Sequence, residues 1–187
     1  MKVIFLDVDD VINNESTKAR CNDVRGIDGA LVRKLKAIVD ATDAAIILSS
    51  TWRLGYNKDH QDLQDFTKYL SNKLGKCHLR SVGCTPDLGR NGILRGHEIQ
   101  EWLNKNDDIV TEWVVLDDEA FGDFDECGIV PHWVQPVNGL TDEDVEHAIR
   151  ILNGELNEPK TESKAKKTRK TKKQKAAEEV PMAPAEE

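Results

Sequence analysis

Short apolar runs rich in valine and isoleucine alternate along the chain with segments in which apolar residues recur at helical spacing. The apolar runs do not alternate with polar residues, which is typical of strands covered on both faces, as in a parallel sheet. The pattern predicts five strands, at residues 3–6, 45–48, 78–82, 113–116, and 128–130 together with 133–134.

Four of the intervening segments have the spacing of amphipathic helices. Asp28 precedes the first and Thr141 precedes the last, and each can cap a helix N-terminus. Asp144 completes a capping box with Thr141, and Gly154 ends the last helix. Helices are predicted near residues 31–39, 63–74, 99–103 and 141–152. Strand followed by helix, repeated along the chain, predicts a doubly wound, Rossmann-like α/β fold with a mainly parallel, five-stranded sheet.

Two clusters of acidic residues follow predicted strands. The first strand is followed by Asp7, Asp9 and Asp10, and the fourth by Asp117 and Asp118. Doubly wound sheets bind ligands at the carboxyl ends of their strands, where these acids would converge. Like charges repel, so the cluster needs a cation, and a set of oxygen ligands indicates Mg²⁺ rather than zinc. The alternative is that a single acid caps a turn.

Hydroxyl side chains follow the second strand. Ser49, Ser50 and Thr51 come directly after it, with Arg53 two residues further on. Hydroxyls and free backbone N–H groups at a strand end can hold phosphate oxygens, although serine and threonine also form turns and caps. Whether Ser49 or Ser50 would contact a phosphate depends on where the strand ends.

Arg95 lies at the start of the third predicted helix. A guanidinium there could offset the negative charge of a phosphoryl group next to the carboxylates. It could also be solvated, in which case Arg53, Arg80 or Arg90 could take that place.

These motifs together resemble those of the haloacid dehalogenase (HAD) superfamily over nearly all of residues 1–153. The strand followed by Asp7-x-Asp9-Asp10-Val11, the strand ending in Ser49, the basic helix start and the Asp117-Asp118 pair match its four motifs. More narrowly, the chain resembles the HAD domains of Swiss Army Knife RNA-repair proteins. That similarity rests on three segments, Phe5-Leu6-Asp7-Val8-Asp9, Leu48-Ser49-Ser50-Thr51-Trp52-Arg53 and Gly139-Leu140-Thr141. Many members have Gly-Thr in place of Asp10-Val11.

The resemblance implies a phosphatase that works through an aspartyl-phosphate. Asp7 would be the nucleophile and Asp9 the general acid and base, while Ser49 and Arg95 would hold the phosphoryl oxygens. Additional substrate contacts are expected from Ser50, Thr51 and Arg53. The candidate Mg²⁺ ligands are Asp7, Asp9 through its backbone carbonyl, Asp117 and Asp118. Two alternatives remain, a phosphatase of small metabolites and a noncatalytic HAD-like module that binds phosphate groups or a protein.

The resemblance also implies no cap domain, or a minimal one. Residues 12–27, between the first acidic motif and the first helix, are few and polar and predict a flap. An open site suits a bulky substrate such as a nucleic-acid end or a nucleotide. The basic residues that could line the approach are Lys18, Arg20, Arg25, Arg53 and Arg80.

The charge of the chain divides it in two. The net charge is −8, but residues 155–187 hold nine bases and seven acids, which leaves −10 on residues 1–154. The C-terminal segment is Lys-rich and then acidic, and it has only one leucine, one valine, one methionine and no aromatic residue, so we predict a disordered tail after a HAD-like domain at 1–154. The tail could contact nucleic-acid phosphates or simply be solvated.

The remaining composition favours a cytoplasmic protein. The sequence has no apolar run long enough to span a bilayer and no signal-peptide pattern at its start. Its four cysteines form no Cys-x-x-Cys pair, so we expect reduced thiols and neither a disulfide framework nor a zinc ribbon.

Overall fold

The computed structural model describes residues 1–57, 63–89 and 94–155. The expectations for Arg90 and for the tail beyond Glu155 concern residues outside these ranges. Within them, no helix has both the length and the apolar character needed to cross a membrane.

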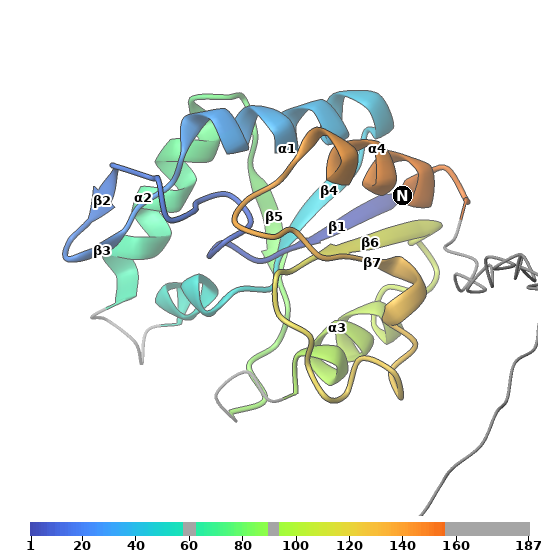
Figure 1. Ribbon diagram of the computed structural model, residues 1–187. Coiled ribbons are helices and arrows are strands. Elements are labelled where there is room, and N and C mark those ends of the chain that lie inside the picture. Colours follow the sequence, from blue (N-terminus) through green and yellow to red (C-terminus); the bar gives the residue numbers. More distant parts are fainter. Residues whose placement is uncertain (58–62, 90–93, 156–187) are drawn as a thin grey trace, which may run out of the picture.

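A five-stranded, fully parallel sheet forms the centre of the fold, with strand order β5-β4-β1-β6-β7 (Figure 1). Its strands are β1 (Lys2–Leu6), β4 (Ala45–Leu48), β5 (Ser81–Cys84), β6 (Glu112–Leu116) and β7 (Trp133–Val134). The predicted α/β fold is therefore confirmed. Leu6 at the end of β1 pairs with Leu48 of β4 and with Leu116 of β6, so the three central strands end level with one another.

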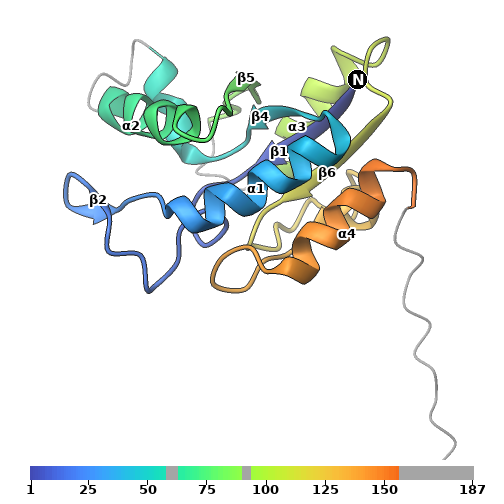
Figure 2. The same ribbon diagram turned by 90° about the horizontal axis from the view of Figure 1, so that it is seen from above.

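Helices cover both faces of the sheet. Residues Ile4 and Leu6 of β1 belong to a core shared with α1, α2 and α4, whereas Val3 and Phe5 pack in a second core with α3. Figures 1 and 2 show α1 and α4 side by side over one face, with α3 on the opposite side of the sheet. The helices are α1 (Gly29–Thr42), α2 (Gln64–Gly75), α3 (Arg95–Asn104) and α4 (Asp142–Leu152). Coverage of both faces explains why the strands are uniformly apolar.

The predicted caps are present at the first and last helices. Asp28 Oδ1 accepts a hydrogen bond from Ala30 N at 2.7 Å at the start of α1. Thr141 and Asp144 exchange side-chain and backbone hydrogen bonds in a capping box at the start of α4. These bonds satisfy N–H groups that would otherwise lack an intrahelical acceptor.

Two predicted strand segments are placed differently. Residues 128–130 do not form a strand, because Gly128 has a φ of +66° and the chain then enters a 3₁₀ helix, η3 (Val130–His132), at Pro131. A proline cannot donate to a strand ladder. The strand predicted at 78–82 begins only at Ser81, since His78 adopts a left-handed φ of +58° at the turn after α2.

Residues 12–27 form a small flap. It contains the antiparallel hairpin of β2 (Arg20–Cys21) and β3 (Val24–Arg25) and lies beside α2 (Figure 1). A hairpin of this size leaves the carboxyl ends of the central strands without a cap domain between β1 and α1, as predicted.

Candidate active site

The level ends of the central strands bring together residues from three motifs. Asp7 N donates to Leu116 O at 2.9 Å, and Ser49 N donates to Leu6 O at 2.8 Å, so sheet hydrogen bonding continues one residue past each strand. Asp117 follows β6 directly. Asp7, Ser49 and Asp117 therefore occupy adjacent positions at the carboxyl edge of the sheet, where ligands of doubly wound folds bind.

Arg95 joins the two acidic motifs. Its Nη1 lies 3.0 Å from Asp7 Oδ1 and 2.8 Å from Asp117 Oδ2, and all three side chains are at least nine-tenths buried. The guanidinium also lies over the Phe121 ring, 4.8 Å from its centroid. Because Arg95 is the first residue of α3, the helix position fixes where this buried cation sits.

The carboxylates carry more negative charge than Arg95 offsets. Burial raises the pKa of Asp7, against the opposing effect of Arg95. Burial and the neighbouring Asp7 raise the pKa of Asp117 to about 8 and that of Asp118 to about 6. Such shifts mean that ionising all three groups costs free energy unless another cation is near.

The same three carboxylates fit a hard divalent cation. One oxygen from each of Asp7, Asp117 and Asp118 lies within 4.8 Å of the others. A set made only of carboxylate oxygens matches Mg²⁺, which takes few protein ligands and keeps several waters. The oxygen donors and the excess negative charge both suit that ion.

The side chain of Asp9 is held apart from this group. Asn13 Nδ2 donates to its Oδ1 at 2.8 Å, and Trp52 Nε1 donates to its Oδ2 at 2.9 Å. Asn13 is fully buried, and its own Oδ1 accepts from Asp10 N at 2.9 Å. Asn13 could not be predicted from the sequence, because one asparagine in a polar flap has no distinguishing pattern.

The side chain of Asp10 forms an ion pair with the flap. Its backbone has a left-handed φ of +49°, which aspartate tolerates better than most residues, and its Oδ1 pairs with Arg25 at 2.8 Å. Asp10 O also accepts from the N–H of Gly139 at 2.8 Å. Gly139 has a φ of +98°, a backbone conformation that glycine adopts far more readily than other residues, so glycine is strongly favoured at this position.

The hydroxyl residues after β4 have different surroundings. Ser50 caps the 3₁₀ helix η1 (Thr51–Tyr56) by accepting from Trp52 N at 3.3 Å, and Thr51 is exposed. Ser49 is fully buried, and its Oγ has no hydrogen-bond partner within the described residues. Arg95 Nε is likewise buried and unpartnered in that part of the chain. Buried polar atoms in proteins normally have a hydrogen-bond partner, so these two atoms are exceptions that need an explanation.

Arg53 lies in a buried ion pair. Its Nη2 is 2.7 Å from Glu98 Oε2, and its guanidinium also donates to Ser50 O and Pro86 O. Both charged side chains are about 5% exposed. Arg53 thus links the loop after β4 to α3, a partnership between distant segments that the sequence pattern did not indicate.

A known protein family matches most of the chain. The model of the HAD domain in Swiss Army Knife RNA repair proteins matches residues 3–145, which include every site residue named above. The chain belongs to this family. No curated protein and no solved structure matches it.

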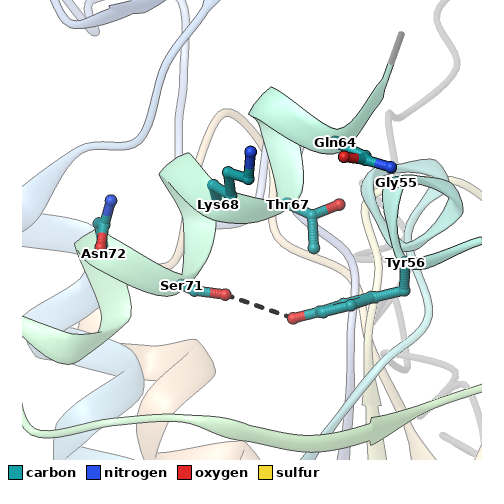
Figure 3. Close-up of a pocket in the computed structure, with 7 residues that line it drawn as sticks. All are labelled: Gly55, Tyr56, Gln64, Thr67, Lys68, Ser71 and Asn72. Atoms are coloured by element: carbon teal, nitrogen blue, oxygen red, sulfur yellow. Dashed lines mark hydrogen bonds between the residues drawn. The ribbon is translucent and has the colours of Figure 1, made fainter. Parts of the chain in front are cut away.

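A sizeable cavity of this HAD domain lies away from the carboxylates. It has a volume of about 490 Å³ between η1 and α2, where Tyr56 Oη lies 3.3 Å from Ser71 Oγ (Figure 3). Its lining is Gly55, Tyr56, Gln64, Thr67, Lys68, Ser71 and Asn72. The lining includes neither the acidic-motif residues nor Arg95, so size alone does not make this cavity the site.

Proposed function

We propose that this chain is a Mg²⁺-dependent phosphohydrolase that removes a terminal phosphate from a nucleic acid or nucleotide through an aspartyl-phosphate on Asp7. The observation that carries the proposal is the buried contact of Asp7 with Arg95, together with two buried polar atoms that have no hydrogen-bond partner in the described parts of the chain, Ser49 Oγ and Arg95 Nε. Such donors suit the oxygens of a phosphoryl group placed against Asp7.

The reaction follows from the roles of the two first-motif aspartates. Asp7 attacks phosphorus, its new Oδ–P bond forms as the bond to the leaving oxygen breaks, and Asp9 gives that oxygen a proton. Asp9 then takes a proton from water as the water attacks phosphorus and the Asp7–phosphorus bond breaks. Ser49 and Arg95 hold the phosphoryl oxygens, on which the transition-state charge lies.

Mg²⁺ would be held by Asp7, Asp118 and the backbone carbonyl of Asp9, with Asp117 supporting the group through Arg95. When bound, the ion supplies positive charge that keeps the carboxylates ionised and neutralises the phosphoryl oxygens. The proposed additional substrate contacts are Ser50, Thr51 and Arg53. In the structure Ser50 and Arg53 shape the loop that carries Ser49.

Two features support a nucleic-acid end or nucleotide as substrate. The flap between β1 and α1 is only a short hairpin, so a bulky substrate can reach the strand ends. The family description refers to RNA repair proteins, which favours a nucleic-acid substrate.

The test is a phosphate-release panel with and without Mg²⁺. Its substrates are 3′- and 5′-phosphorylated oligonucleotides, mononucleotides and sugar phosphates, and its proteins are wild type, Asp7→Asn and Asp43→Asn. Asp43 is exposed at the opposite end of the sheet, and asparagine tolerates the left-handed φ of +55° at this position. Asp43→Asn is therefore a matched control for Asp7→Asn. We expect Mg²⁺-dependent release that only Asp7→Asn abolishes. If no substrate gives metal-dependent release, the domain is a binding module instead.

A further inference from the structure

A second cavity lies directly beside Asp9. It has a volume of about 220 Å³ and is enclosed by the flap strand β3, the start of η1 and the start of α2. The residues that line it are Asp9, Val24, Thr51, Trp52, Leu63 and Phe66. This is smaller than the ~300–1,000 Å³ of a drug-sized ligand site, so it accommodates one ring system rather than several nucleotides.

The chemistry of the lining is selective. Apart from Asp9 and Thr51, the lining side chains are apolar, and among the described residues no lysine or arginine lines the cavity. The side chain of Val24 is 44% exposed, although the residues on either side of it in the hairpin are polar. Sugar hydroxyls or additional phosphates would lose hydration in such a cavity without gaining partners, whereas a flat aromatic ring would bury apolar area.

The position of Asp9 identifies the occupant. If Asp9 protonates the leaving oxygen, the group attached to that oxygen lies on the side of Asp9, with the phosphorus at Asp7. Because Asp9 is itself a wall of the cavity, that group enters the cavity. We propose, on the basis of the function proposed above, that this cavity is the leaving-group subsite and takes the base of the phosphate-bearing nucleoside.

Trp52 links this subsite to the acid. Its indole N–H donates to Asp9 Oδ2, and its ring packs edge-on against Phe66, with centroids 5.3 Å apart at 77°. Trp52 is only 7% exposed, so its ring is fixed by the surrounding core. A base that packs against this wall therefore also orients the carboxyl group that acts on its own leaving oxygen.

A subsite for the base predicts that substrates with a base are turned over more efficiently than substrates without one. Two pairs of substrates test this. In the first, ribose 5-phosphate and a nucleoside 5′-monophosphate share the phosphoester and differ by the base. In the second, a 3′-phosphorylated oligonucleotide is compared with the same oligonucleotide lacking its terminal base. We expect kcat/KM to favour the base-containing member of a pair by about tenfold, in line with base–aromatic packing. Val24→Asn, which keeps the side chain small and uncharged, should reduce that ratio at least threefold.

Val82→Asn is the matched control. Val82 is 54% exposed on β5 and does not line this cavity, so the ratio should stay at the wild-type value. Phe66→Leu provides a second variant that keeps apolar bulk but removes the aromatic ring, and it should also lower the ratio.

The outcomes separate this inference from the proposed function. If release depends on Asp7 but the base has no effect, or if Val24→Asn and Phe66→Leu leave the ratio unchanged, the subsite is overturned and the phosphohydrolase remains. If phosphotyrosine is turned over faster than nucleotides and responds to Val24→Asn, the occupant is an aryl group and the nucleoside assignment is wrong. Loss of Asp7 dependence would overturn the proposed function itself.

Discussion

Arg95 Nη1 lies 3.0 Å from Asp7 Oδ1, and the ion pair is almost fully buried. The same nitrogen is 2.8 Å from Asp117 Oδ2, so one guanidinium connects the first and fourth acidic motifs. Removing it would leave two buried carboxylates facing each other without a counter-charge.

Replacing Arg95 should affect both activity and stability. For Arg95→Gln we expect phosphate release to fall at least a hundredfold, and the free energy of unfolding to fall by about 3–5 kcal/mol, the usual cost of breaking a buried pair. Steady-state kinetics and denaturant unfolding measure the two effects. Arg150→Gln is the control, because its pair with Glu155 is exposed and should contribute little. Wild-type kinetics for Arg95→Gln would contradict the role given to this residue.

The raised pKa values predict how stability depends on pH without Mg²⁺. Between the ordinary carboxyl pKa near 4 and the values of about 6 for Asp118 and about 8 for Asp117, the folded state binds more protons than the unfolded state. Their contribution to the free energy of unfolding is therefore complete at low pH and declines as pH rises from about 4 to about 8.

Mg²⁺ should reverse this trend, because it favours the ionised carboxylates. The increase in Tm on adding Mg²⁺ should be larger at pH 8 than at pH 5.5, and Asp118→Asn should reduce both the decline with pH and the Mg²⁺ effect. Thermal unfolding across the pH range tests this, with Asp43→Asn as control. An equal Mg²⁺ effect at both pH values would argue against a cation at these carboxylates.

The Arg53–Glu98 pair is expected to stabilise the fold. Arg53→Met leaves the buried Glu98 carboxylate without its cation and should destabilise the fold by about 3–5 kcal/mol. The double variant Arg53→Met/Glu98→Leu should recover much of that loss, since no unpaired charge remains buried. The exposed Lys105–Glu101 pair, at 2.6 Å, serves for comparison and should contribute about 0.5 kcal/mol or less. Additive effects in the Arg53–Glu98 cycle would show that the two side chains are not coupled.

Trp52 should act as a positioning residue for Asp9. Trp52→Phe keeps an aromatic ring but loses the N–H that bonds Asp9 Oδ2, so protonation of the leaving oxygen should be impaired. We expect kcat to fall about tenfold or more for an alkyl phosphate and much less for p-nitrophenyl phosphate, whose leaving oxygen needs little protonation. Trp102→Phe, which alters an aromatic contact with Phe5 on the other face of the sheet, is the control. An equal loss on both substrates would indicate a packing role only.

The sequence predicts the parts of this fold that depend on local pattern. Short stretches of sequence are enough to predict the apolar strands, the caps at Asp28 and Thr141 and the acids after β1 and β6. The acids then come together because the strands end level with one another. The partners of individual side chains are not readable in this way. The contact of Trp52 with Asp9 spans 43 positions and that of Arg53 with Glu98 joins separate elements, and both depend on packing that no local pattern encodes.

The strand errors have a local cause. Ile129 and Val130 have strand-like side chains, but the left-handed Gly128 before them and Pro131 after them turn the chain into η3. Backbone conformation at two residues here outweighs the β propensity of their neighbours.

The most direct test of the account is to look for phosphate on Asp7 during turnover. After rapid acid quenching of the reaction with Mg²⁺ and a phosphorylated substrate that the protein turns over, mass spectrometry should find one phosphate on the peptide that contains Asp7, and the label should be absent from Asp7→Asn. Phosphate release by Asp7→Asn at the wild-type rate, or a covalent phosphate on a different residue, would contradict the central claim.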